Sequence, residues 1–253
     1  MHPDESALLA AIRAHPDDDT ARLVYADWLD EHSQPERAEL IRVQVNLART
    51  RGTIESATER REWHTRMRAL LHAHSKRWRK ELPNIRGVRW GPFERGLVDS
   101  FLFDFERYTP EIPFALDRTL EVVPPRAIAV FVNSRDTPDP IPEWALFLKW
   151  PGLDRFGEFA PRFSYYLWSE PDRLLRAYEL LAAREWGERP HTLDLRESSV
   201  SDDALRMLAE VPHARRFPAL RLRLLTGPFP EGAASAEARR ALIARFGDRV
   251  RFE

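Results

Sequence analysis

The segment His191–Ala209 combines a strand pattern with a helix pattern in about twenty residues. Leu193 and Leu195 alternate with polar residues, as on one face of a short strand. Ser201 then offers a helix N-cap, and two aspartates in the first turn are followed by an apolar stripe made of Ala204, Leu205 and Leu208. A unit of this size cannot bury its own apolar face, so the pattern predicts that it stacks on similar neighbours.

Strand and helix patterns alternate through much of the chain beyond residue 86. We expect strands at 128–133, 163–168, 193–195, 219–225 and 250–252, and helices at 142–150, 171–185, 203–211 and 235–246. The inward positions line up as Val130, Tyr165, Leu193, Leu220 and Val250. Their separations of about 27 to 35 residues lie near the roughly 20 to 29 residues of a leucine-rich repeat. The pattern predicts an α/β fold with a parallel sheet.

The first 82 residues carry a helical pattern instead. Apolar stripes predict helices at 5–14, 23–29, 36–48 and 55–80. The polar run Asp17–Thr20 marks the start of the second helix, with Asp19 or Thr20 as its N-cap. We therefore expect a helical domain over residues 1–82 and a repeat-like domain over residues 83–253.

The string LVYADWL and its flanks form a specific pattern over about forty residues. Its residues are Ala11, Ile12, Pro16, Asp17, Asp18, Arg22, Leu23, Val24, Tyr25, Ala26, Asp27, Trp28, Leu29, Arg37, Glu39, Ile41, Arg42 and Gln44. This pattern resembles the bacterial repeat-companion domain, which is found attached to leucine-rich repeats and some other modules. The resemblance implies a helical N-terminal domain in front of repeats, and it implies no activity.

The segment Leu193–Val200 resembles the frame of a leucine-rich repeat, in which alternating leucines precede a polar residue and another apolar one. Ser198 stands where the repeat has an asparagine, whose side chain ties the turn backbone into a ladder. Serine makes this bond more weakly. We therefore expect about four to six degenerate repeats in a short curved stack, a leucine-rich-repeat-like solenoid with a parallel sheet.

Composition narrows the class of protein. Of the 253 residues, 43% are hydrophobic and 31% are charged, as in a globular protein with a thin, layered core. The absence of cysteine excludes disulfides, thiolate metal sites and a cysteine nucleophile. The N-terminus lacks the pattern of a signal peptide, and no apolar run approaches the roughly 18 residues of a membrane span. We expect a cytoplasmic protein without a membrane partner.

Catalytic and metal-binding motifs do not stand out in the sequence. It has no G-x-S-x-G, no Walker loop and no H-E-x-x-H. His64, His72 and His74 are not spaced for a helical zinc site, and the aspartates at 17–19 are explained by a helix N-terminus. Asp27 is expected to pair with Arg22 or Arg42. We therefore predict no enzyme activity, no cofactor and no metal.

Charge is unevenly distributed along the chain. Residues 1–48 carry a net charge of −6 and residues 49–80 one of +7, within a total of −1. The basic helix expected at 58–80 could follow a phosphate backbone through Arg60, Arg61, Arg66, Arg68, Lys76, Arg77, Arg79 and Lys80. The alternative is a solvated helix that pairs with the acidic helices before it, which the near-neutral total favours. Nucleic-acid binding is thus the second functional hypothesis.

The best candidate for binding is the concave face of the predicted sheet. Side chains alternate along a strand, so two rows are expected on this face, Phe131, Tyr166, Asp194 and Arg221 in one, and Asn133, Trp168, Arg196 and Arg223 in the other. Aromatic and arginine side chains dominate protein interfaces, unless loops of the same chain cover them. We predict a non-catalytic module that binds a protein partner or acts as a scaffold, with a role as a subunit of a larger assembly as a further alternative.

Overall fold

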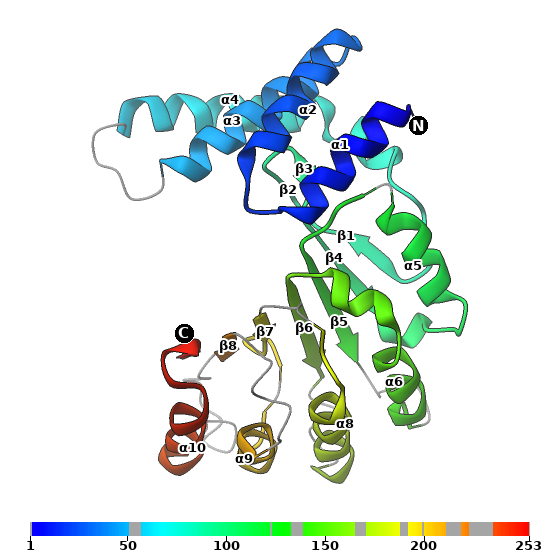
Figure 1. Cartoon of the computed structure of the whole chain (residues 1–253), viewed down its shortest axis with the longest axis vertical. Coiled ribbons are helices and arrows are strands. Elements are labelled where there is room, and N and C mark those ends of the chain that lie inside the picture. Colours follow the sequence, from blue (N-terminus) through cyan, green and yellow to red (C-terminus); the bar gives the residue numbers. More distant parts are fainter. Residues whose placement is uncertain are drawn as a thin grey trace. The chain divides into compact units, whose positions relative to one another are not determined.

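The computed structural model of the chain divides into two compact units (Figure 1). Unit 1 comprises Met1–Ile85, Trp90–Ser100 and Ala115–Arg126, and unit 2 comprises Arg86–Arg89, Phe101–Phe114 and Ala127–Glu253. The structure describes residues 2–50, 57–121, 123–132, 139–164, 171–187, 192–198, 200–210, 219–222 and 235–252. The chain passes between the units several times around residues 85–127. The sequence analysis expected a single boundary after residue 82.

Unit 1 is mainly helical, as the sequence predicted. Its elements are α1 (Pro3–Ala14), α2 (Asp19–Glu31), α3 (Pro35–Arg49), α4 (Ala57–Lys80), the short antiparallel pair β2 (Phe93–Glu94) and β3 (Leu97–Val98), and the later part of α5 (Ile112–Leu120). Each of α1, α2 and α3 packs against the helix that follows it in the chain. Among the described residues, no helix is both long enough and apolar enough to cross a membrane.

The N-cap of α2 differs from the prediction by one residue. Asp18 caps the helix, and its Oδ1 accepts a hydrogen bond from the Thr20 backbone N–H at 2.8 Å. The expected caps Asp19 and Thr20 are therefore the first two residues of the helix. Three consecutive aspartates leave the position of a cap ambiguous in sequence, because each of them can accept this bond.

The apolar stripes of unit 1 meet in two clusters of the described residues. One joins α1, α2 and α3 through buried side chains that include Ile12, Tyr25, Leu29, Ile41 and Val45. The other includes Leu40 of α3, Leu70 and Trp78 of α4, and Phe93 and Val98 of the β2–β3 pair. The predicted apolar side of α4 thus faces the core, and its charged side faces solvent.

Unit 2 is a mixed α/β unit with a mostly parallel sheet. Its strands among the described residues are β1 (Val88–Trp90), β4 (Ser100–Asp104), β5 (Ala127–Val132), β6 (Glu158–Phe163), β7 (Thr192–Asp194), β8 (Ala219–Leu222) and β9 (Val250–Phe252), in the order β1-β4-β5-β6-β7-β8-β9. From β5 to β9 each strand is parallel to the next. The predicted α/β class and the parallel succession of strands are confirmed.

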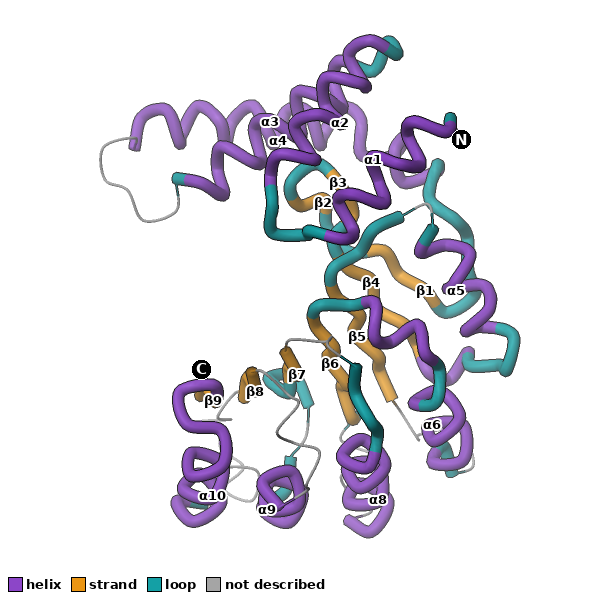
Figure 2. Tube along the Cα trace, viewed as in Figure 1, coloured by secondary structure: helices purple, strands orange, loops and turns teal. Residues whose placement is uncertain are grey.

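The helices of unit 2 that connect these strands lie on one side of the sheet. They are α6 (Ile141–Leu148), α8 (Pro171–Ala183), α9 (Asp202–Glu210) and α10 (Ala236–Phe246), and short 3-10 turns lie at 105–107, 151–155 and 247–249. When parallel strands follow each other in order, right-handed connections place every helix on the same face. Figure 2 shows these helices side by side, and each packs against the next.

The register of the sheet places three of the five predicted inward positions in one row with Ile128 of β5, and the predicted Val130 is also buried, two residues further along β5. Leu193 pairs with Leu220, and Leu220 with Val250. On β6, however, Phe159 faces Leu193, because the strand is 158–163 and not the predicted 163–168. Pro161 lies in the middle of this strand. Because proline is usually excluded from central strands, the sequence pattern did not predict a strand here. Tyr165 lies outside the described residues.

Aromatic side chains fill the layer between sheet and helices in unit 2. Trp144 of α6 is fully buried, and it stacks on Phe147 and Phe159 and meets Phe163 edge to face. Its Nε1–H donates to the backbone oxygen of Ala177 in α8 at 3.1 Å. This ring therefore joins a strand and two helices, which is the role expected of a core residue in a layered unit.

Candidate functional site

The first candidate site is the side of the sheet opposite the helices, here called the second sheet face. Along β5 the fully buried Ile128, Val130 and Val132 alternate with half-buried residues, which include Phe131. By the same alternation the second sheet face carries Ala127, Ala129, Phe131, Glu158, Ala160, Arg162, Thr192, Asp194 and Arg251. It combines an aromatic ring with charges of both signs.

Asp194 and Arg196, two of the predicted site residues, contact each other. The Arg196 Nη2 lies 2.6 Å from Asp194 Oδ2, and its Nε lies 2.9 Å from Oδ1. The Arg196 backbone N–H donates to the same Oδ1 at 3.0 Å. Asp194 is buried, and this bidentate ion pair with Arg196 fixes the turn after β7. Arg196 thus turns back onto the strand end.

The register of the strands differs from the two rows of residues that were predicted for the concave face of the sheet. Asp194 and Arg221 pair across β7 and β8, as expected, although the side chain of Arg221 is not described. Phe131 instead pairs with Arg162, which places it further along the strands than Asp194. The remaining predicted residues, Asn133, Tyr166, Trp168 and Arg223, lie outside the described residues.

Sequence reasoning missed two charged groups on or beside the second sheet face. Arg162 of β6 forms an ion pair with Glu197 at 2.9 Å, and Arg251 of β9 is exposed. Arg162 follows from the alternation of Phe159, Pro161 and Phe163, once the strand is placed correctly. Arg251 lies one residue after the predicted inward position Val250, so the rule used for the other strands could have found it.

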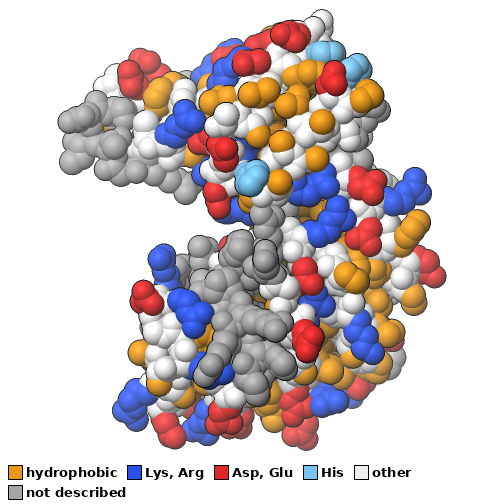
Figure 3. Space-filling model, in the orientation of Figure 1, with side chains coloured by type: hydrophobic (Ala, Val, Ile, Leu, Met, Phe, Trp, Pro, Cys, Tyr) orange, Lys and Arg blue, Asp and Glu red, His pale blue; other side chains and the backbone are white. Residues whose placement is uncertain are grey.

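The basic helix is α4, and its predicted contacts divide into two groups. Arg66 forms a two-pronged ion pair with Glu39 of α3 at 2.5 and 2.6 Å, and Arg60 and Arg79 donate to backbone oxygens. The others, Arg61, Arg68, Lys76, Arg77 and Lys80, are exposed and form no ion pair with a described residue. Acidic and basic side chains are interspersed on the face of the molecule drawn in Figure 3.

The predicted partner of Asp27 is Arg42. Arg42 Nη2 lies 2.6 Å from Asp27 Oδ1, and Arg42 Nη1 lies 2.7 Å from Asp30 Oδ2. The Asp27 side chain is 71% exposed, so this carboxylate is a surface group.

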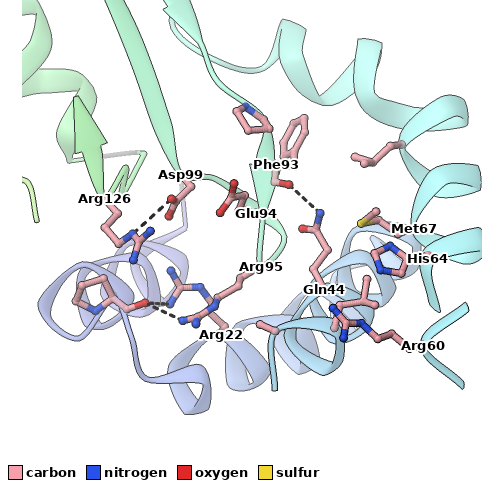
Figure 4. Close-up of a pocket in the computed structure, with 15 residues that line it drawn as sticks. Arg22, Gln44, Arg60, His64, Met67, Phe93, Glu94, Arg95, Asp99 and Arg126 are labelled. Atoms are coloured by element: carbon pink, nitrogen blue, oxygen red, sulfur yellow. Dashed lines mark hydrogen bonds and ion pairs between the residues drawn. The ribbon is translucent and has the colours of Figure 1, made fainter. Parts of the chain in front are cut away.

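Unit 1 contains a cavity of about 450 Å³, which the sequence analysis did not predict (Figure 4). Figure 4 shows Arg22, Arg95 and Arg126 toward one end of it and Arg60, His64 and Met67 toward the other. The Nη1 atoms of Arg22 and Arg95 both contact the Pro16 backbone oxygen, at 2.7 and 3.5 Å, so the two guanidinium groups lie close together. Four arginines line the cavity against two acidic residues, Glu94 and Asp99.

One wall of the cavity is the β2–β3 turn, held by Gln44 of α3. Gln44 is buried, its Nε2 donates to the Phe93 oxygen, and its Oε1 accepts from the Gly96 N–H, both at 2.7 Å. A Cβ on Gly96 would lie 2.0 Å from Cγ1 of Ile41, so only glycine permits this close approach. Arg95, next to it, has a φ of 49°, in the left-handed region.

Arg22 is the most buried of the cavity's arginines, with only 2% of its surface exposed. Its Nη1 binds backbone oxygens of Pro16 and Asp18, and its Nε has no hydrogen-bond acceptor among the described residues. Burial lowers the pKa of Arg22, and the nearby charge of Arg95 lowers it further, while Asp99, Asp19 and Asp17 act in the opposite direction.

Among the described residues, no group of three or more histidine, aspartate or glutamate side chains is placed to hold a metal ion. Asp19, from the acidic run, instead lies 3.1 Å from Arg49 and 3.5 Å from Arg95. Searches of protein-family models, of curated proteins and of solved structures found no match to the chain.

Proposed function

We propose that unit 2 is a short leucine-rich-repeat-like stack and that the N-terminal helices of unit 1 are a repeat-companion domain. The observation that supports the repeat is the position of Ser198. Its Oγ is buried and accepts a hydrogen bond from the Phe163 N–H of the preceding layer at 3.2 Å. This is the bond between layers that the asparagine of the repeat would make. The hydroxyl of Tyr178 also lies 3.2 Å from this Oγ and shares a hydrogen bond with it.

We infer that the chain is a non-catalytic module that binds a protein partner through the second sheet face. The single observation behind this inference is that the helices following β5 to β8 share one side of the sheet. The opposite side carries the exposed Arg251 and the half-buried Phe131 and Arg162, while Ala160, Thr192 and Asp194 on it are buried. An aromatic ring between charges of both signs suits a polar protein surface better than a membrane or a nucleic acid. The partner is therefore a folded protein with a mixed-charge surface, alone or within an assembly.

The experiment is affinity capture from cells that produce the protein, followed by mass spectrometry and by titration of each purified partner. Arg251→Glu reverses an exposed charge on the second sheet face, and Arg240→Glu makes the same change on α10, on the helix side. We expect Arg251→Glu and the double variant Trp168→Ala/Arg196→Ala to lose a partner that Arg240→Glu retains. Equal affinity of every variant for every captured protein would contradict the proposal.

Nucleic-acid binding through α4 is a second candidate, supported by the exposed cations Arg61, Arg68, Lys76, Arg77 and Lys80. Binding to phosphates would weaken steeply as salt is added, because condensed counter-ions are released. We expect Arg68→Gln/Arg77→Gln to reduce both the affinity for RNA or duplex DNA and its salt dependence. Arg240→Gln is the matched control. A gel shift that is absent at low salt, or the same in both variants, excludes this candidate.

A further inference from the structure

The interior of unit 1 holds a cation that forms no direct ion pair with a described carboxylate, and Asp99, Asp19 and Asp17 act on it only from a distance. Arg22 is nearly fully buried, it binds only neutral carbonyl oxygens in the hydrogen bonds described above, and it forms no ion pair with a described carboxylate. Its Nε–H has no acceptor in the part of the chain that the structure describes. A buried charge that is neither paired nor fully hydrogen-bonded is costly, so a fold retains it where something else supplies the missing anion.

Further positive charge gathers at the same end of the cavity. Arg95 and Arg126 lie there beside Arg22 (Figure 4), and their carboxylate contacts are long. Arg95 Nη1 lies 3.5 Å from Asp19 Oδ1, and Arg126 lies 3.5 Å from Asp99 and 3.6 Å from Asp17. A well-made pair of this kind is about 2.7 to 2.9 Å long. Since a guanidinium has about five N–H donors, these two groups retain donors for a further acceptor.

The geometry of this end is fixed by the fold. Gln44 anchors the β2–β3 turn at two backbone groups, and Gly96 lets the turn lie directly on α3. Arg95 is thereby held with a positive φ that an arginine rarely adopts. Arg22 is fixed from the other side by the Pro16 oxygen. The backbone of Arg95 and the guanidinium group of Arg22 are therefore held in place before any ligand enters, which lowers the entropic cost of binding.

We propose that this cavity binds a small phosphorylated organic molecule, with its phosphoryl group between Arg22, Arg95 and Arg126. The volume of about 450 Å³ falls within the range of small-molecule sites. Leu47, Met67 and Leu71 supply apolar surface for the organic part, and Arg60 and His64 can bond its polar groups. Guanidinium groups from different elements suit the oxygens of a tetrahedral phosphoryl group, whereas a planar carboxylate is satisfied by one arginine.

The test uses phenyl phosphate as the probe, titrated calorimetrically into the 253-residue chain at constant ionic strength. Arg95→Asn removes a phosphate donor but keeps a residue that tolerates a positive φ. Arg68→Asn makes the same change on the exposed side of α4, outside the cavity. We expect Arg95→Asn to weaken the binding of phenyl phosphate about tenfold or more, and Arg68→Asn to leave it within about twofold. Circular dichroism of each variant verifies the fold.

A second measurement distinguishes the chemical class of the ligand. Benzoate has the same ring with a carboxylate in place of the phosphate, and inorganic phosphate is the anion without the ring. We expect both to bind more weakly than phenyl phosphate. Arg22→Gln should also lose the binding of phenyl phosphate. If this variant does not fold, the comparison of Arg95→Asn with Arg68→Asn still tests the proposal. The proposal is overturned if the wild type does not bind phenyl phosphate, if both asparagine variants bind it equally, or if benzoate binds as tightly.

Discussion

The buried Ser198 of unit 2 and the buried Arg22 of unit 1 differ in how far the fold supplies their hydrogen-bond partners. In unit 2, Ser198 and Tyr178 are neutral, and they contact each other and the backbone of the next layer, so the fold itself accounts for them. In unit 1, Gln44 is likewise satisfied by the β2–β3 turn, but Arg22 is charged and lacks a carboxylate partner among the described residues. A buried group whose hydrogen bonds the fold supplies indicates architecture, whereas Arg22 combines burial with a cavity beside it, and this combination favours a ligand.

The largest effect should come from the aromatic layer of unit 2. Trp144→Ala removes a fully buried ring that contacts β6 and α8, and we expect it to lower the free energy of unfolding by about 3 to 5 kcal/mol. Urea denaturation followed by circular dichroism measures the loss. Hydrogen exchange should show it in β5, β6 and α8 first, with the amides of α1 to α3 as the internal reference. A cost below about 1 kcal/mol would mean that Trp144 is not a core residue.

The next effect compares two glycines that both have a positive φ. Gly96 in unit 1 and Gly247 in unit 2 have φ values of 82° and 60°, but a Cβ on Gly96 meets Ile41, and a Cβ on Gly247 meets nothing within 4 Å. We expect Gly247→Ala to cost about 1 kcal/mol from backbone strain alone, and Gly96→Ala about 2 to 4 kcal/mol from strain plus overlap. Thermal unfolding of both variants measures the difference. Equal costs would show that the β2–β3 turn can move away from α3.

Ser198 gives a smaller effect that bears on the proposed repeat. Ser198→Ala leaves the buried Phe163 N–H without its acceptor and should cost about 1 to 3 kcal/mol. Ser198→Asn restores an acceptor and introduces the residue of the leucine-rich repeat, so it should recover most of that loss. Tyr178→Phe is the control, because it removes the hydroxyl contact to Ser198 and leaves the bond to Phe163 intact. If Ser198→Asn is less stable than Ser198→Ala, the analogy with the repeat fails.

The difference between the units also explains what the sequence could predict. The helices of unit 1 and the strand–helix alternation of unit 2 follow from local periodicity, and both were predicted. The position of β6 was missed because Pro161 contradicts a central strand locally, and the pairing with β5 and β7 outweighs that preference. The cavity was missed because Arg22, Gln44 and Arg95 are far apart in sequence. Arg22 and Gln44 even belonged to the recognised pattern, yet no periodicity indicates that their side chains are buried.

The smallest effect concerns the surface of unit 1. Arg66 holds the pKa of Glu39 below its usual value, mainly through their hydrogen bonds. A carboxylate with a lowered pKa in the folded state stabilises the protein at neutral pH, and this contribution disappears as the pH falls through that pKa. Since both side chains are more than a third exposed, we expect Arg66→Ala to cost only about 0.2 to 1 kcal/mol at pH 7 and less in high salt. The measurement is urea denaturation of wild type and Arg66→Ala at pH 7 and pH 3. A difference in stability that persists undiminished at pH 3 would show that Arg66 acts through the packing of its aliphatic stem and not through its charge.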